Sequence, residues 1–305
     1  MIEKKEGKKM VDNDRNRVKE LLEQQIGRLE IHSITRMGGL TNRTYKVETT
    51  DGIYVVRIPG EGTEEIIVRS DEKKSTELAC RLGIDAKLYY FDGKTGEKIT
   101  DYIVDFVTMN AETLRCEENI AKCAEVFKTL HTSNVYTEVP FDVMEMSNTY
   151  EDFIRRHGGS FYDDFAEVKA YINDIKNSYM VNVKKVPCHN DALCENWVRQ
   201  GEKMYLIDWE YAGMNDPMWD LADVSIEADF TEEKDAFFLK CYFGREATEE
   251  ERKAFLINKV LIDYLWSLWG KTRAVYDGEE LEEYARVRYA RMKGFLSALK
   301  SEEYL

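Results

Sequence analysis

Pro187-Cys188-His189-Asn190-Asp191-Ala192-Leu193-Cys194-Glu195-Asn196 is the stretch that decides the fold, and Tyr205-Leu206-Ile207-Asp208-Trp209-Glu210 follows it. Four residues separate Asp191 from Asn196, a spacing that lets a tight loop turn both side chains toward one point. The apolar run from Met204 to Ile207 predicts a strand that presents Asp208 at its end. The stretch therefore supplies a carboxylate, an amide oxygen and a second carboxylate in a fixed order.

The order H-x-D-x-x-x-x-N, strand, Asp is the pattern of a kinase catalytic loop and its metal-binding aspartate. In such a site Asp191 orients the substrate hydroxyl or accepts its proton, while Asn196 and Asp208 bind Mg²⁺. This sparse oxygen set suits Mg²⁺, which prefers few carboxylates together with phosphate oxygens and water. Taken singly, the three residues are also typical of turns and loops. Their combination favours the kinase interpretation.

Length and charge limit the class of protein. A chain of 305 residues with 43% hydrophobic content can fill the cores of two lobes, which we expect at 1–107 and 108–305. The formal charge of −15 argues against nucleic acid or anionic lipid as the main partner. It favours attraction of a small cation, or simply keeps the protein soluble.

The cysteines and the N-terminus indicate the compartment. The six cysteines show no C-x-x-C spacing, so neither a disulfide framework nor a zinc site is indicated. The charged N-terminus lacks the apolar region of a signal peptide, and no apolar run is long enough to span a membrane. We therefore expect a cytoplasmic protein without membrane insertion.

The N-terminal part predicts one helix followed by strands. After a frayed tail of about ten residues, a helix capped by Asp12 or Asp14 should run to about Ile26. Strands should follow from residue 31 to residue 58. Thr50-Asp51-Gly52 lies between two of them and predicts a hairpin with a type I′ turn.

A glycine-containing segment, residues 38–44, precedes that hairpin. Gly39 lets backbone amides approach a polyphosphate, and Asn42 and Thr44 can add donors. The segment is not a Walker loop, because the Gly-Lys-Ser/Thr ending is absent. A glycine pair is also typical of a plain turn, but its place before the hairpin favours a nucleotide-covering role.

Further nucleotide contacts are expected in the same lobe. Arg57 ends a strand where a kinase carries its phosphate-binding lysine, and an arginine can neutralise phosphates as well. The helix from about Arg69 to Leu82 offers Glu72 or Glu77 as its partner, and we favour Glu72. Strands at 88–91 and 98–103 follow. Asp101 to Ile103 should then form the hinge whose backbone holds the adenine edge.

The rest of the chain predicts helices at 117–131, 147–156 and 161–179, and again through the last hundred residues. His131 and His157 lack a partner motif, which indicates helix-end or surface positions. Asp220 enters a helix after the catalytic loop, and we expect it to bond the backbone of that loop.

Trp266 and Trp269 lie three residues apart and so share one helix face. Such a pair is often part of a core. An indole face is also the best side-chain surface for a quaternary ammonium, and Tyr284 on the next helix could close such a cage.

With these motifs in place, the chain from about residue 30 to 295 resembles the choline/ethanolamine kinase family, especially its bacterial choline kinases. The resemblance rests on the catalytic loop, on the segment 206–222 and on Trp266-Ser267-Leu268-Trp269. It implies an α+β, bilobal, protein-kinase-like fold with an N-terminal antiparallel sheet and a mainly helical C-terminal lobe.

The resemblance implies ATP-dependent phosphorylation of the choline hydroxyl, with Mg²⁺ and ATP as cofactors. Asp191 would be the base, and Asn196 and Asp208 would hold Mg²⁺. Asn42 and Arg57 would contact phosphates, with Glu72 bracing Arg57. An aromatic wall formed by Trp266, Trp269 and Tyr284 would surround the trimethylammonium of the substrate. The Glu227 carboxylate and Tyr211 would add further contacts.

Alternatives remain at this point. A sister kinase acting on ethanolamine, thiamine or an aminoglycoside would share the catalytic loop. A catalytically silent nucleotide-binding scaffold would keep the fold, but all three base and metal groups are present. The sequence does not fix the oligomeric state or the pathway that uses the product.

Overall fold

A computed structural model of the chain describes residues 2–37, 42–60 and 67–301. The chain forms two compact units. Unit 1 contains residues 1–108 and 196–212, and unit 2 contains residues 109–195 and 213–305. Unit 1 therefore includes a short stretch that follows the catalytic aspartate in sequence.

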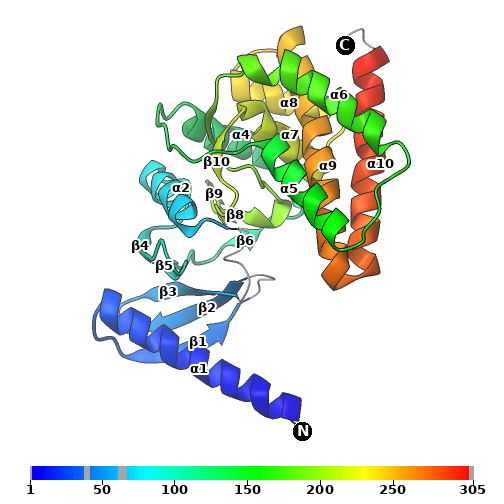
Figure 1. Cartoon of the computed structure of the whole chain (residues 1–305). Helices are drawn as coiled ribbons and strands as arrows, with labels where there is room; N and C mark the ends of the chain where they lie inside the picture. The colour runs from blue at the N-terminus through cyan, green and yellow to red at the C-terminus, as the bar shows by residue number, and fades with distance from the viewer. Residues whose placement is uncertain (1, 38–41, 61–66, 302–305) are drawn as a thin grey trace. The chain divides into compact units, whose positions relative to one another are not determined.

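Unit 1 is built on an antiparallel sheet in the strand order β1-β2-β3-β5-β4 (Figure 1). Its strands are β1 (Ile31–Arg36), β2 (Asn42–Thr49), β3 (Ile53–Pro59), β4 (Leu88–Phe91) and β5 (Lys98–Asp101). The hairpin predicted at 50–52 is confirmed, because β2 pairs with β3 across it. The type I′ turn is wrong: of Asp51 and Gly52 only the glycine has a positive φ, 156°, and three residues link the strands.

The N-terminal helix α1 (Ile2–Gln25) packs its apolar face on this sheet. Val18, Leu21 and Leu22 of α1 are buried against Tyr45 and Val56 of the sheet. The helix already includes the residues that we expected to fray. Neither Asp12 nor Asp14 caps it, because the helix already begins at Ile2. The Asp14 carboxylate instead accepts a hydrogen bond from the Tyr45 hydroxyl at 2.7 Å and pairs with Arg43 at 2.8 Å.

Helix α2 (Arg69–Leu82) follows, and Gly83 ends it with a φ of 73°. Three more strands of unit 1 form a small sheet in the order β6-β8-β9: β6 (Val107–Thr108), β8 (Trp197–Gln200) and β9 (Lys203–Leu206). The Leu206 N–H donates to the Ile84 carbonyl at 2.9 Å, so the segment after α2 is tied to β9. This bond places the strand before Asp208 next to the end of α2.

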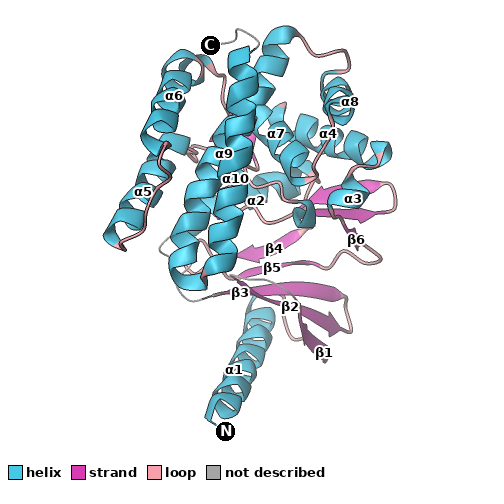
Figure 2. Ribbon diagram, turned by 90° about the vertical axis from the view of Figure 1, so that its right-hand side faces the viewer, coloured by secondary structure: helices cyan, strands magenta, loops and turns pink. Residues whose placement is uncertain are grey.

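Unit 2 is mainly helical, and its long helices α9 and α10 run side by side (Figure 2). Its helices are α3 (Ala111–Leu114), α4 (Glu117–His131), α5 (Val143–Arg156), α6 (Phe165–Ser178), α7 (Pro217–Glu227), α8 (Glu232–Phe243), α9 (Glu249–Asp277) and α10 (Glu279–Ser301). Two strands, β7 (Val186–Cys188) and β10 (Gly213–Asn215), pair antiparallel. None of the described helices has the length and apolar character that crossing a membrane requires.

The predicted helices of unit 2 are found, with shifted starts. Helix α4 matches the prediction for 117–131. Helix α5 begins four residues earlier than predicted because the Asp142 side chain caps it, accepting from the Met144 and Glu145 N–H groups. Helix α6 begins later, at Phe165, against which the ring of Phe161 stacks at 4.6 Å.

Candidate active site

The catalytic loop of unit 2 leaves β7 and is fixed by buried hydrogen bonds. The two oxygens of Asp220, on α7, accept from the N–H groups of His189 and Asn190, each at 2.8 Å. Asn190 has a φ of 68°, and its side-chain oxygen accepts from Asn215 at 2.9 Å. The prediction that Asp220 bonds the loop backbone is confirmed. Asp191 therefore follows two residues whose positions are held from outside the loop.

His131 is the last residue of α4, as the helix-end prediction has it, but its ring is buried and contacts Asp220, so the surface alternative is wrong. The ring is 6% exposed and hydrogen-bonded to Asp220 Oδ2 at 3.0 Å and to the Tyr242 hydroxyl at 2.9 Å. His131, Cys188 and Asp220 offer three potential metal ligands close together. Both Asp220 oxygens and both ring nitrogens already have partners, so the cluster is a hydrogen-bond network that supports the loop.

A second aspartate of α7, Asp223, holds the loop at Ala192. No functional role was predicted for it from the sequence. Asp223 Oδ2 accepts from the Ala192 N–H at 2.5 Å. Asp220 and Asp223 are three residues apart and so face the same way on α7. The sequence could have indicated this role, because residues three apart on a helix lie on the same face, and Asp220 was already expected to bond the loop.

The predicted aromatic wall is assembled in unit 2. The rings of Trp266 and Trp269 meet edge to face at 6.2 Å between centroids, and Trp269 meets Tyr284 of α10 in the same way at 5.9 Å. Trp266 is 5% exposed and belongs to the core, whereas Trp269 and Tyr284 are half-buried. Trp266 therefore packs in the core against the half-buried Trp269.

Glu227 ends α7 and is not an isolated carboxylate. It pairs with Arg288 of α10, and Arg288 Nη1 also donates to Asp263 of α9 at 3.1 Å. Burial raises the pKa of Tyr284; Arg288 opposes this shift, and Glu227 and Asp191 add to it. Glu227 and Asp191 can shift the pKa of Tyr284 only if they lie close to it. Asp191, Glu227 and Tyr284, three of the predicted site residues, therefore share one neighbourhood of unit 2.

In unit 1, the predicted pairing of Arg57 with Glu72 is confirmed. Arg57 on β3 is 5% exposed and Glu72 on α2 is 1% exposed, and their side chains form a hydrogen-bonded ion pair. Arg57 Nη2 also donates to the Gly96 carbonyl at 2.9 Å. The carboxylates of Asp208 and Glu210 act on Arg57 electrostatically, so the pair lies near Asp208.

Two residues of this cluster were not identified from the sequence. Arg69, the first residue of α2, donates to Glu72 at 2.7 Å and lies 3.7 Å from Glu210. The Glu210 carboxylate accepts from the side-chain amide of Asn42 at 3.4 Å. Asn42 was expected to contact nucleotide phosphates, and it lies in this charged cluster. Glu210 immediately follows Trp209 in the quoted stretch, but its role required the fold to bring α2 close.

Asn196 and Asp208 are brought together by the hairpin of β8 and β9. The Ile207 N–H donates to the Asn196 carbonyl at 2.9 Å, so the residue before Asp208 is bonded to Asn196. Burial raises the pKa of Glu210 to about 7, and the neighbouring carboxylates of Asp208 and Glu72 contribute. A divalent cation would relieve this repulsion, and the donors are the oxygens that Mg²⁺ prefers. The residues present therefore fit Mg²⁺.

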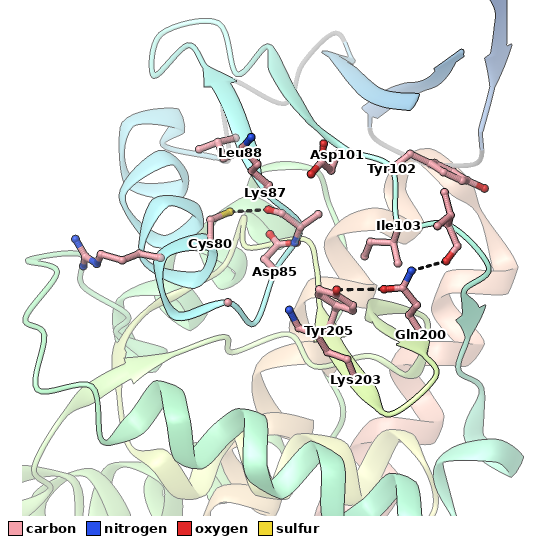
Figure 3. Close-up of a pocket in the computed structure, with 14 residues that line it drawn as sticks. Cys80, Asp85, Lys87, Leu88, Asp101, Tyr102, Ile103, Gln200, Lys203 and Tyr205 are labelled. Atoms are coloured by element: carbon pink, nitrogen blue, oxygen red, sulfur yellow. Dashed lines mark hydrogen bonds between the residues drawn. The ribbon is translucent and has the colours of Figure 1, made fainter. Parts of the chain in front are cut away.

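The predicted hinge borders a pocket of about 610 Å³ within unit 1 (Figure 3). Asp101 and Ile103 line it, and Asp101 also accepts from the Tyr89 hydroxyl at 2.6 Å. Within the described residues, no hydrogen bond engages the Ile103 N–H. That group is therefore available to an adenine edge.

Three predicted residues remain to be placed. Gly39 lies outside the described residues. Thr44 lies on β2, half-buried and paired across the hairpin with Arg57. Tyr211 belongs to unit 1 and not to the unit that carries the aromatic wall.

Comparisons with known proteins agree on one family. The chain matches the family model described as choline/ethanolamine kinase over residues 34–265. The crystal structure of choline kinase LicA from Streptococcus pneumoniae is 32% identical, with a TM-score of 0.78, covering 94% of this chain and 99% of that one. A structure of LicA in complex with AMP is also 32% identical, with a TM-score of 0.75, covering 93% and 98%. Ethanolamine kinase 1 of Homo sapiens is 26% identical, covering 87% of this chain and 68% of the relative.

These similarities confirm the expected α+β, bilobal, protein-kinase-like fold, with its N-terminal antiparallel sheet and helical remainder. The matched region spans both halves of the catalytic pattern, from β1 to α9. It includes Asp191, Asn196 and Asp208. By this match over most of its length, the chain belongs to the choline/ethanolamine kinase family.

Proposed function

We propose that this chain is an ATP-dependent choline kinase, which transfers the γ-phosphoryl group to the choline hydroxyl and yields phosphocholine and ADP. One observation carries the assignment to a cationic alcohol. Asp191, Glu227 and Tyr284 share a neighbourhood in unit 2, and Tyr284 contacts Trp269. A carboxylate that can receive a hydroxyl proton is thus close to aromatic faces that attract a quaternary ammonium.

In this proposal each residue has a specific task. Asp191 orients the hydroxyl and accepts its proton as the new phosphoester bond forms. Trp269 and Tyr284 hold the trimethylammonium, and Glu227 supplies a carboxylate in the same unit. Trp266 supports Trp269 from the core. The buried hydrogen bonds of Asp220 and Asp223 keep the loop in place, so that little reorganisation is needed during the reaction.

Unit 1 would hold the nucleotide. We assign the adenine edge to the backbone of Asp101 and Ile103, and the phosphates to Arg57, Asn42, Thr44 and the backbone at Gly39. Asn196 and Asp208 would hold Mg²⁺, which neutralises charge on the phosphates when bound. The structure of LicA with AMP supports nucleotide binding for this chain. All six cysteines are free thiols, which fits the reducing cytoplasm that we propose as its compartment.

The runner-up substrate is ethanolamine, because the matched family covers both amino alcohols. Its primary ammonium is strongly hydrated and gains less from an aromatic wall than a quaternary ammonium does. One methyl group discriminates by only about 1 to 3 kcal/mol, so the preference is quantitative.

A substrate panel tests the assignment. ADP release by the purified chain with ATP and Mg²⁺ should be stimulated by choline, and its kcat/KM should exceed that for ethanolamine, thiamine and kanamycin. Omission of Mg²⁺ should abolish turnover. A larger kcat/KM for ethanolamine or kanamycin would refute the choline assignment, and no stimulation by any alcohol would favour the scaffold.

A further inference from the structure

Three carboxylates line one face of α7 and meet different partners. Asp220, Asp223 and Glu227 are three and four residues apart, which places them on neighbouring turns of one helix face. Asp220 accepts two loop N–H groups, and Glu227 pairs with Arg288. Asp223 differs, because its second oxygen is buried without a hydrogen-bond partner among the described residues.

Asp223 is fully buried, at 1% exposure. Its Oδ2 accepts from the Ala192 N–H at 2.5 Å. Its Oδ1 is buried and has no hydrogen-bond partner among the described residues. A buried oxygen without a partner costs free energy. Its presence beside the catalytic loop therefore points to a partner or a proton that belongs to the reaction cycle.

The charges around Asp223 favour a proton on it. Burial raises the pKa of Asp223 well above its usual range, and the carboxylates of Glu227 and Asp191 raise it further. Arg288 opposes this, but it already pairs with Glu227 and Asp263. The titratable and charged groups near it come from α7, the catalytic loop, α9 and α10: Asp220, Glu227, Asp191, Cys194, Asp263, Tyr284 and Arg288. These surroundings disfavour the ionised form of Asp223 in the substrate-free enzyme.

We propose that Asp223 is a positioning residue of the substrate pocket that braces Ala192 with one oxygen and releases a proton from the other when the cationic substrate binds. This inference rests on the proposed function, because it needs a cation in the pocket formed by Asp191, Glu227 and Tyr284. The positive charge of choline stabilises the ionised form of a nearby carboxyl. The O–H bond of the acid breaks, the proton passes to the buffer, and the carboxylate stays beside the ammonium.

The first test counts protons. Choline binding is measured calorimetrically without ATP, in buffers that differ in ionisation enthalpy. The wild type should release up to about one proton per choline at a pH where Asp223 is protonated. Asp223→Asn, which keeps an oxygen for the Ala192 N–H, should release none. Asp235→Asn is the matched control: Asp235 is another carboxyl with a raised pKa on the next helix, but it bonds Ser225 and Lys259, and this variant should release protons like the wild type.

The second test separates titration from bracing. In the wild type, the choline KM should fall as the pH rises, by at most about tenfold per pH unit, and should level off once substrate-free Asp223 is ionised, because binding then no longer has to expel a proton. In Asp223→Asn this dependence of the choline KM on pH should flatten. Asp223→Ala loses the hydrogen bond to the Ala192 N–H as well, so its kcat should fall below that of Asp223→Asn.

The outcomes are distinguishable. If the wild type phosphorylates choline but releases no proton on binding it, the inference is wrong and the proposed function stands. Release that persists in Asp223→Asn would also overturn the inference. If choline is neither bound nor phosphorylated, the proposed function itself has failed. The wild-type measurements decide the question even if a variant does not fold.

Discussion

Asn190 shows at the scale of one residue how the loop is preorganised. A positive φ is rare for a residue other than glycine and costs free energy. The surrounding structure offsets this: Asp220 accepts the Asn190 N–H, and Trp219 Nε1 donates to the Asn190 carbonyl at 3.1 Å. Because the residue before it is held on several sides, Asp191 has little freedom to move away from the position that the loop gives it.

Asp191→Asn should abolish most turnover while leaving ATP binding intact. The amide keeps the shape of the side chain but cannot accept the hydroxyl proton, and general-base contributions are typically about 10²- to 10⁴-fold in rate. The nucleotide contacts that we assign lie in unit 1, so ATP affinity should change less than about threefold. Steady-state ADP release and ATP titration measure the two effects. Undiminished turnover would remove Asp191 from the mechanism.

Trp269→Leu should raise the choline KM by about tenfold, because the lost cation–π attraction is on the order of 1 to 2 kcal/mol. The ethanolamine KM should rise less, and kcat should stay within about threefold. Tyr284→Phe is the control, since it keeps the ring face and removes only the hydroxyl; its choline KM should remain within about twofold. Equal effects on both amino alcohols would show that Trp269 acts through packing and not through the quaternary ammonium.

At the scale of elements, the close approach of α9 and α10 positions Tyr284 against Trp269. A Cβ on Gly270 would lie 2.8 Å from Tyr284 Cδ1 and 3.0 Å from the Ala285 Cβ. Glycine is thus required on α9 because the neighbouring helix leaves no room for a side chain. The aromatic wall and the contact between the two helices are therefore one structural feature.

Gly270→Ala should destabilise the protein by about 1 to 3 kcal/mol, the usual cost of overpacking, and should also raise the choline KM by displacing Tyr284. Gly294→Ala is the matched control on α10, because nothing lies within 4 Å of its added Cβ. The control should be stabilised by up to about 1 kcal/mol, since alanine favours a helix interior. Urea unfolding and choline kinetics compare the two. A Gly270→Ala variant as stable as Gly294→Ala would contradict the tight contact.

The sequence predicted those parts of the fold and site whose causes are local. The β2–β3 hairpin followed from Asp51-Gly52, and the bounds of α4 were predicted as the structure has them. The pairing of Arg57 with Glu72 was predictable because a kinase pattern fixes which strand and helix carry the two residues. The hydrogen bonds of Asp220 to the loop backbone were also predicted from the kinase pattern.

The misses have long-range causes. His131 is buried because Asp220 and Tyr242, its partners, are 89 and 111 residues away. The contacts of Asp14 with Tyr45 and Arg43 also depend on the sheet that packs against α1. The clustering of Glu210 with Arg69 depends on the end of β9 approaching α2. No window of sequence contains both members of such pairs, so periodicity and turn chemistry could not reveal them.

At the scale of the whole molecule, burying carboxyl groups at neutral pH lowers the free energy of unfolding, because their ionised form is unfavourable in the protein interior. The chain carries 58 acidic and 43 basic residues, and several carboxyls are buried where ionisation is unfavourable. Asp85 is the clearest case outside the hairpin of β8 and β9. It is 7% exposed and lies at the pocket of unit 1 (Figure 3), and burial raises its pKa to about 6.

This shift determines how stability depends on pH. An unfolded aspartate has a pKa of about 4, so between about pH 4 and pH 6 the folded state binds more protons than the unfolded state. The free energy of unfolding therefore falls as the pH rises through that window, by about 2 to 3 kcal/mol from Asp85, and stays low above it. Asp85→Asn should remove this part of the pH dependence, although the amide gives up one acceptor oxygen.

Urea unfolding at about pH 4 and about pH 7, with divalent cations chelated, measures the difference within each variant. Because the lost acceptor affects both pH values alike, the wild type should lose about 2 to 3 kcal/mol more than Asp85→Asn on going from the lower to the higher pH. Asp51→Asn, an exposed change in the β2–β3 turn, should keep the wild-type profile. If the free energy of unfolding changed equally with pH in the wild type and in Asp85→Asn, water would reach the carboxyl in solution. The ionised Asp85 would then not destabilise the folded state.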